Sequence, residues 1–108
     1  MQTRISGLHN FFQMVRERPS MYVRNCSLDD LELICHGYAM ALGVHGIDEF
    51  GTRFNQQFAE YLLERYGWSM CCGWARGIRE QSHGDDEAFR RFFELVEEFR
   101  DHLRIVKG

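Results

Sequence analysis

The sequence predicts an all-α protein, organised as a single-domain bundle of about five helices. Apolar residues recur at helical spacing in five segments, and no stretch of useful length shows the alternation of a half-buried strand. The 108 residues fit one domain, covering 1–108, and leave no room for a second. A hydrophobic content of 44% is too high for a disordered chain.

The first helix is expected over about 5–17. Its apolar positions follow the i, i+3, i+4, i+7 rule and are Ile5, Leu8, Phe11, Phe12 and Val15. Pro19 ends this helix, because proline lacks the N–H that a helix interior requires. We expect Met21 and Tyr22, just beyond it, to return the chain to the core.

The second helix is expected over about 28–44. Ser27 and Asp30 resemble a capping box at its start. One side carries the predicted core residues Leu28, Leu31, Ile34, Cys35, Tyr38, Ala41, Leu42 and His45. The opposite side is also largely apolar and carries Leu33, His36, Met40 and Val44. A helix with two apolar sides is usually buried in the centre of a bundle, and the alternative is that the second side is an exposed binding patch.

Thr52 is the expected N-cap of a third helix over about 53–66, with Gly67 as its left-handed C-terminal residue. Ser69 precedes a fourth helix whose apolar face is Met70, Cys71, Trp74, Ala75 and Ile78. Gly73 and Gly77 weaken this segment and would let another helix approach closely.

Asp85 is the expected N-cap of the last helix, with two further carboxylates in its first turn. Its core side is formed by Phe89, Phe92, Val96, Phe99 and Leu103.

The four cysteines are expected to be reduced thiols packed in the interior, because the chain carries no export signal and is large enough to fold without disulfides. As helix neighbours, Cys71 and Cys72 would point about 100° apart and would not share a metal ion. We expect no metal and no cofactor. No apolar run is long enough to span a bilayer, so the expected location is the cytoplasm.

No phosphate-binding loop, dinucleotide fingerprint, zinc-protease motif or nucleophile elbow is present, and we expect no enzymatic activity. A nucleophile–base pair assembled in space from Cys35 or Cys72 with a histidine stays the alternative; the candidate histidines are His36, His45 and His83. The net charge of −3 argues against direct binding of nucleic acid.

Residues 25–52 carry five acids and no Lys or Arg. An apolar centre flanked by unpaired carboxylates suits a basic protein partner, since burial supplies affinity while charge supplies orientation. The predicted contact residues are Asp29, Asp30, Glu32, Leu33, Met40, Val44, Asp48 and Glu49.

A second acidic surface is expected on the last helix, where Glu94, Glu97, Glu98 and Asp101 share one side. Arginines lie three or four positions away, so a solvated, salt-bridged face is one interpretation of this row. A docking surface for a basic partner is the other.

Several segments resemble a known family. The motif Arg18-Pro19-Ser20-Met21-Tyr22, then Ser27-Leu28-Asp29-Asp30-Leu31 and Gly37-Tyr38, is similar to the opening of small helical proteins encoded beside bacterial polymorphic toxins. The blocks from Gly73 to Ile78 and from Ala88 to Leu95 fit the same pattern.

The resemblance implies an immunity protein, of the contact-dependent growth inhibition type, that binds and neutralises the C-terminal domain of one cognate toxin. Many such toxins are nucleases with basic clefts, which an acidic inhibitor would mask. A different class stays open, a self-associating helical adaptor or regulatory subunit that forms a homodimer through the second apolar side of residues 28–44.

Overall fold

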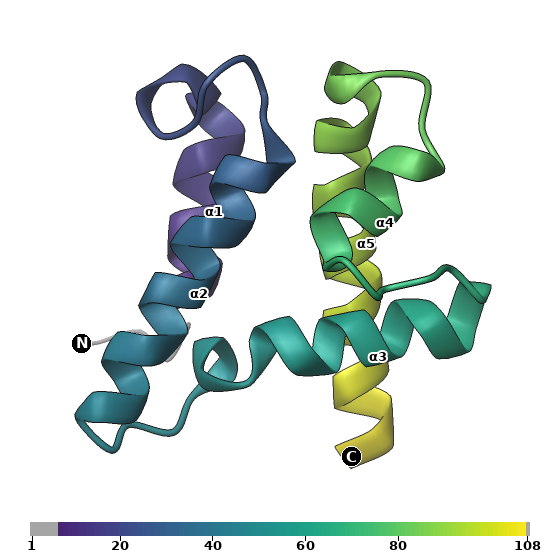
Figure 1. Cartoon of the computed structure of the whole chain (residues 1–108). Coiled ribbons are helices and arrows are strands. Elements are labelled where there is room, and N and C mark those ends of the chain that lie inside the picture. Colours follow the sequence, from purple (N-terminus) through teal and green to yellow (C-terminus); the bar gives the residue numbers. More distant parts are fainter. Residues whose placement is uncertain (1–6, 108) are drawn as a thin grey trace.

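The computed structural model describes residues 7–107, and within this range it contains five α-helices, two short 3-10 turns and no strand (Figure 1). The elements are α1 (Gly7–Glu17), η1 (Pro19–Met21), α2 (Leu28–Val44), η2 (Phe50–Thr52), α3 (Phe54–Tyr66), α4 (Trp74–Glu80) and α5 (Asp85–Lys107). The prediction of an all-α bundle is confirmed. The expected start of the first helix, at Ile5, lies outside the described residues.

The helices form two groups joined by a crossing helix (Figure 1). In this view α1 and α2 lie at one side, α4 and α5 at the other, and α3 runs across between them, while α2 also packs directly against α4. A single hydrophobic core connects all five helices. α2 packs against α3, α4 and α5 with one side, and the residues on its opposite side are exposed.

Aromatic side chains from different helices fill the centre of the core. The ring of Phe54 on α3 lies 5.3 Å from that of Phe12 on α1 and 6.0 Å from that of Trp74 on α4. Trp74 in turn stacks on Phe92 of α5 at 4.9 Å. Such ring pairs contribute about 0.5–1.5 kcal/mol each beyond the area they bury, so this cluster holds the two helix groups together.

The core side of α2 is shorter than the sequence predicts. Its buried residues are Leu28, Leu31, Cys35 and Leu42, as expected. Ala41 and His45, also expected in the core, are exposed. They lie at the end of the helix, where the chain leaves α2 for the loop that leads to η2 (Figure 1).

Three helix ends follow local sequence signals. The Asp30 N–H donates to Ser27 Oγ at 3.1 Å, although the Asp30 carboxylate turns to Arg24 instead of completing a capping box. Gly67 ends α3 with φ +74°, and its N–H donates to the Leu63 carbonyl. Pro19 ends α1 and begins η1.

Three other local expectations are wrong. Thr52 belongs to η2 and does not cap α3; its hydroxyl accepts the Glu49 N–H at 3.0 Å and donates to the Ile47 carbonyl. Asp85 is the first helical residue of α5 and not its N-cap. Met21 is 64% exposed, so that only Tyr22 of this pair reaches the core, where its ring meets Phe11.

The fourth helix begins at Trp74, several residues later than the apolar spacing predicts. Gly73 adopts φ +96° and ψ 162°, a conformation that ends the preceding turn and that other residues rarely adopt. Cys71 and Cys72 therefore lie in a turn, and both are exposed, contrary to the expectation of packed thiols.

The two glycines of this segment have different neighbours. Gly73 faces the Glu32 carboxylate of α2, which agrees with the expected close approach of another helix. Gly77 faces Met70 and the Ser69 carbonyl, so it makes room for the preceding turn and not for a helix.

Candidate functional site

The outer side of α2 carries a row of exposed apolar side chains. We call Leu33, His36, Met40 and Val44 the outer stripe. Leu33, Met40 and Val44 are 69%, 71% and 80% exposed, and the His36 side chain is 54% exposed. From Leu33 to Val44 the stripe is about 16 Å long at 1.5 Å per residue. The interpretation of α2 as a central buried helix is wrong, and its second apolar side faces solvent.

One more exposed apolar residue follows the helix. Ile47, shortly beyond the end of α2, is 46% exposed. Single exposed apolar residues are ordinary on protein surfaces, whereas a contiguous group with a polar rim is typical of an interaction site.

The carboxylates at the start of α2 are paired within the chain. Asp30 forms two bonds of 2.9 Å with the Arg24 guanidinium, and this partner lowers the pKa of Asp30 to about 2. Asp29 lies 3.1 Å from Arg79 of α4. The expectation of unpaired carboxylates is therefore wrong here, because arginines from outside residues 25–52 reach them.

Glu32 joins α2 to α4. Its side chain is 15% exposed, and Oε2 accepts the backbone N–H of Trp74, the first residue of α4, at 3.1 Å. The His36 imidazole lies 3.8 Å away on the next turn. Burial raises the pKa of Glu32. This carboxylate therefore holds a helix end within the fold and is not free for a partner.

The carboxylates beyond α2 differ in exposure. Asp48 is 67% exposed and lies 2.9 Å from Arg53. Glu49 is half-buried near Tyr38, whose pKa is raised by burial and by this carboxylate. Three of the five acids of this segment are thus paired with the arginines Arg24, Arg53 and Arg79, and Glu32 and Glu49 form no ion pair with an arginine in the described residues.

The acidic row on α5 is mostly engaged as well. Glu98 accepts the hydroxyls of Tyr61 at 2.9 Å and Tyr66 at 2.6 Å, which fastens α3 to α5. Burial and Glu98 raise the pKa of Tyr61 to about 12. Glu97 lies 3.6 Å from Arg100, and Asp101 pairs with Arg104.

Glu94 differs from the other three acids of this row. It is exposed and forms no ion pair within residues 7–107. The row therefore agrees with a salt-bridged face at two of its four positions, Glu97 and Asp101, while Glu98 is engaged by tyrosine hydroxyls.

A surface pocket of about 280 Å³ adjoins the outer stripe. α2 contributes Glu32 and His36 to its lining, and α4 contributes Trp74. Asn55 of α3 also lines the pocket, and its side-chain oxygen accepts the Trp74 indole N–H at 3.0 Å. The sequence analysis missed Asn55, since no local pattern connects residues so far apart in the chain. The pocket offers a partner side chain a place to insert beside the stripe.

The candidate nucleophile Cys35 is fully buried, and burial strongly raises the pKa of its thiol, which keeps it protonated. Over residues 7–107, no cluster of three or more His, Cys, Asp or Glu side chains has metal-site geometry. Among the helices of the same range, none combines the length and the apolar character that crossing a bilayer demands.

Comparison of the chain with protein-family models, with curated proteins and with solved structures finds no match in any of the three.

Proposed function

We propose that this protein is an immunity protein, which binds one cognate bacterial toxin domain and neutralises it by stoichiometric protein–protein inhibition, without catalysis. The observation that carries the proposal is the outer stripe of α2, an exposed apolar row flanked at both ends by acids. The resemblance of the Arg18–Tyr22 and Ser27–Leu31 motifs to toxin-associated immunity proteins supports it.

The outer stripe supplies the affinity of the proposed complex. A few buried side chains dominate most interfaces, and truncation of such a residue raises the dissociation constant at least tenfold. Leu33 and Met40 are both exposed and lie on either side of His36 along the stripe, and His36 lines the adjoining pocket. We assign them the central contact with the toxin.

The acids supply orientation and a fast encounter with a basic toxin, such as a nuclease domain. Exposed ion pairs contribute about 0–1 kcal/mol, so a toxin lysine or arginine can replace an internal partner at little cost. Asp29 and Asp48, with side chains 58% and 67% exposed, are the acids best placed for this exchange. Asp30 and Glu32 are held by Arg24 and the Trp74 N–H, and we assign them structural roles. Within the row of Glu94, Glu97, Glu98 and Asp101, Glu94 is the acid that forms no ion pair in the described residues, and we assign it as open to a partner.

The function is tested by co-purifying the tagged protein with the product of the adjacent upstream gene and by expressing that product's C-terminal domain in cells. We expect a stable one-to-one complex and rescue of growth. Failure of both binding and rescue would overturn the immunity function.

The placement of the interface is tested separately with Leu33→Ser/Met40→Ser. We expect at least a tenfold loss of toxin affinity with unchanged thermal stability. Leu63→Ser is the matched control, because Leu63 is 51% exposed on α3, away from the stripe. Equal affinity of the stripe variant and the control would show that the toxin binds elsewhere.

The outer stripe also suits contact with a second copy of the chain. A homodimer of this kind is what the alternative function, a self-associating adaptor, requires. An isologous contact would pair the outer stripes of two protomers across a two-fold axis. Sedimentation velocity over a range of concentrations distinguishes the two functions. We expect a monomer, whereas a tight dimer that Leu33→Ser/Met40→Ser dissociates would favour the adaptor.

A further inference from the structure

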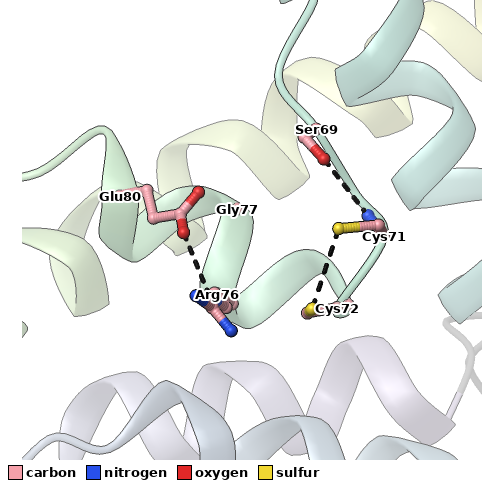
Figure 2. A pocket seen from close by; sticks show the side chains of 7 residues that line it. Ser69, Cys71, Cys72, Arg76, Gly77 and Glu80 are labelled. Carbon is pink, nitrogen blue, oxygen red and sulfur yellow. Dashed lines mark hydrogen bonds and ion pairs between the residues drawn. The ribbon is translucent and has the colours of Figure 1, made fainter.

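Two neighbouring thiols meet on the surface in the turn before α4. Cys71 Sγ and Cys72 Sγ lie 3.7 Å apart, and both residues are exposed (Figure 2). They line a surface pocket of about 210 Å³ together with Ser69, Arg76, Gly77 and Glu80. This pocket lies outside the outer stripe of α2 and shares no residue with it.

The backbone brings the two sulfurs together. Consecutive side chains of a helix point about 100° apart, but the Cys71–Cys72 pair lies in a turn that Gly73 ends at φ +96°. The Gly73 N–H closes this turn on the Met70 carbonyl at 3.1 Å, and the Cys71 N–H lies 3.5 Å from Ser69 Oγ. The two thiols therefore face one another in the folded chain.

The charges around the pair favour thiolate chemistry over metal binding. Hydrogen bonds from Ser69 and Cys72 lower the pKa of Cys71, and the Arg76 guanidinium adds to this shift. Arg76, held 3.0 Å from Glu80, lines the same pocket, and its positive charge disfavours a metal cation there. No third ligand completes a metal cluster in the described part of the chain.

We propose that Cys71 and Cys72 form a dithiol site that low-molecular-weight disulfides, such as glutathione disulfide, oxidise reversibly. The Cys71 thiolate attacks one sulfur of the disulfide, which breaks the S–S bond and releases one thiolate. The Cys72 thiolate then attacks Cys71 Sγ and displaces the second thiolate. Two cysteines are oxidised, the added disulfide is reduced to two thiols, and the cysteine protons pass to solvent.

The product is chemically labile. A disulfide brings the sulfurs to about 2.05 Å and usually joins Cα atoms about 4.4–6.8 Å apart, whereas neighbouring Cα atoms lie about 3.8 Å apart. The bond between Cys71 and Cys72 is therefore strained and easily reduced, which is typical of regulatory disulfides. Both thiols are exposed, so the reaction needs no unfolding.

The site is tested by incubating the reduced full-length protein with glutathione disulfide and counting free thiols after denaturation. We expect the count to fall from four to two, with a mass about 2 Da lower and a disulfide in the peptide that contains both residues. Reduced glutathione should reverse the change.

Cys72→Ser is the diagnostic variant, because it removes the second attack and should trap glutathione on Cys71. Cys26→Ser is the matched control and should oxidise like the wild type. A wild-type protein that keeps four free thiols, or that carries two glutathione adducts and no internal disulfide, would overturn the proposal.

Discussion

The Glu32 carboxylate is expected to stabilise the contact between α2 and α4, and Glu32→Ala tests this directly. The substitution leaves the Trp74 N–H, the first of α4, without its acceptor at 3.1 Å. An N-cap acceptor is worth about 0.5–2 kcal/mol, and an unsatisfied buried donor costs about 1–3 kcal/mol. Against this, alanine favours the helix and the substitution removes a largely buried charge. We therefore expect a net loss of about 1–2 kcal/mol in the free energy of unfolding.

The loss is measured at pH 7 by urea and thermal denaturation, with unfolding monitored by circular dichroism. For a domain of this size, 1 kcal/mol lowers Tm by roughly 4–8 °C. Glu94→Ala is the matched control, since Glu94 is an exposed acid on α5 without an ion pair in the described part of the chain. Surface substitutions of this kind change stability by about 0.5 kcal/mol at most. If Glu32→Ala and Glu94→Ala have the same effect, the capping role of Glu32 is refuted.

Glu32→Gln separates the hydrogen bond from the charge, because the amide oxygen still accepts the Trp74 N–H. Burial raises the pKa of Glu32 above its usual 4.5, so the folded protein binds this proton more tightly than the unfolded chain. The contribution of Glu32 to stability therefore falls as the pH rises from 4.5 through the raised pKa. We expect the stability of Glu32→Gln relative to wild type to increase over the same interval. A constant difference between pH 4 and pH 7 would contradict this assignment.

Three further predictions follow from single contacts. Gly73→Ala should destabilise the protein by about 1–3 kcal/mol in urea denaturation, because φ of Gly73 is +96° and the new Cβ would lie 2.9 Å from a carboxylate oxygen of Glu32. Gly43→Ala is the control and should not destabilise the protein, because a Cβ on this residue of α2 meets no other atom within 4 Å. Phe54→Ala should lower the free energy of unfolding by about 3–5 kcal/mol, and a loss below about 1 kcal/mol would show that the aromatic cluster is not the centre of the core. An NMR titration should find the pKa of the Asp30 carboxyl near 2, so the stabilising effect of its ion pair with Arg24 disappears as the pH falls from 3.8 toward 2. In Arg24→Ala the pKa of Asp30 should return toward 3.8.

Local chemistry accounts for the features that the sequence predicted correctly. Ser27 caps α2 through an N–H three residues away, and Gly67 ends α3 with a left-handed conformation. Pro19 ends α1 because it lacks a donor. In each case the deciding contact or conformation lies within a few residues along the chain, so the sequence pattern contains it.

The predicted fourth helix exists, and Trp74, Ala75 and Ile78 are buried as expected, but its start was placed several residues too early. Apolar spacing alone places Met70 and Cys71 on a helical face, but periodicity does not register the Gly73 conformation that breaks the helix. Gly73 contacts Glu32, 41 positions earlier in the chain. The same error concealed the dithiol, because the assumed helix turned Cys71 and Cys72 apart.

The sequence by itself determined the helical class of the protein, most helix boundaries and the presence of two apolar sides on α2, because these depend on spacing and on neighbouring residues. The tertiary structure decided which of those sides is covered and which acids are paired. Asp29 meets Arg79 fifty residues away, and Glu98 meets Tyr61 from another helix. Helical periodicity defines the faces of a helix but carries no information about what packs against them. The exposed stripe, its paired acidic rim and the adjoining pocket therefore emerged only when the five helices were assembled.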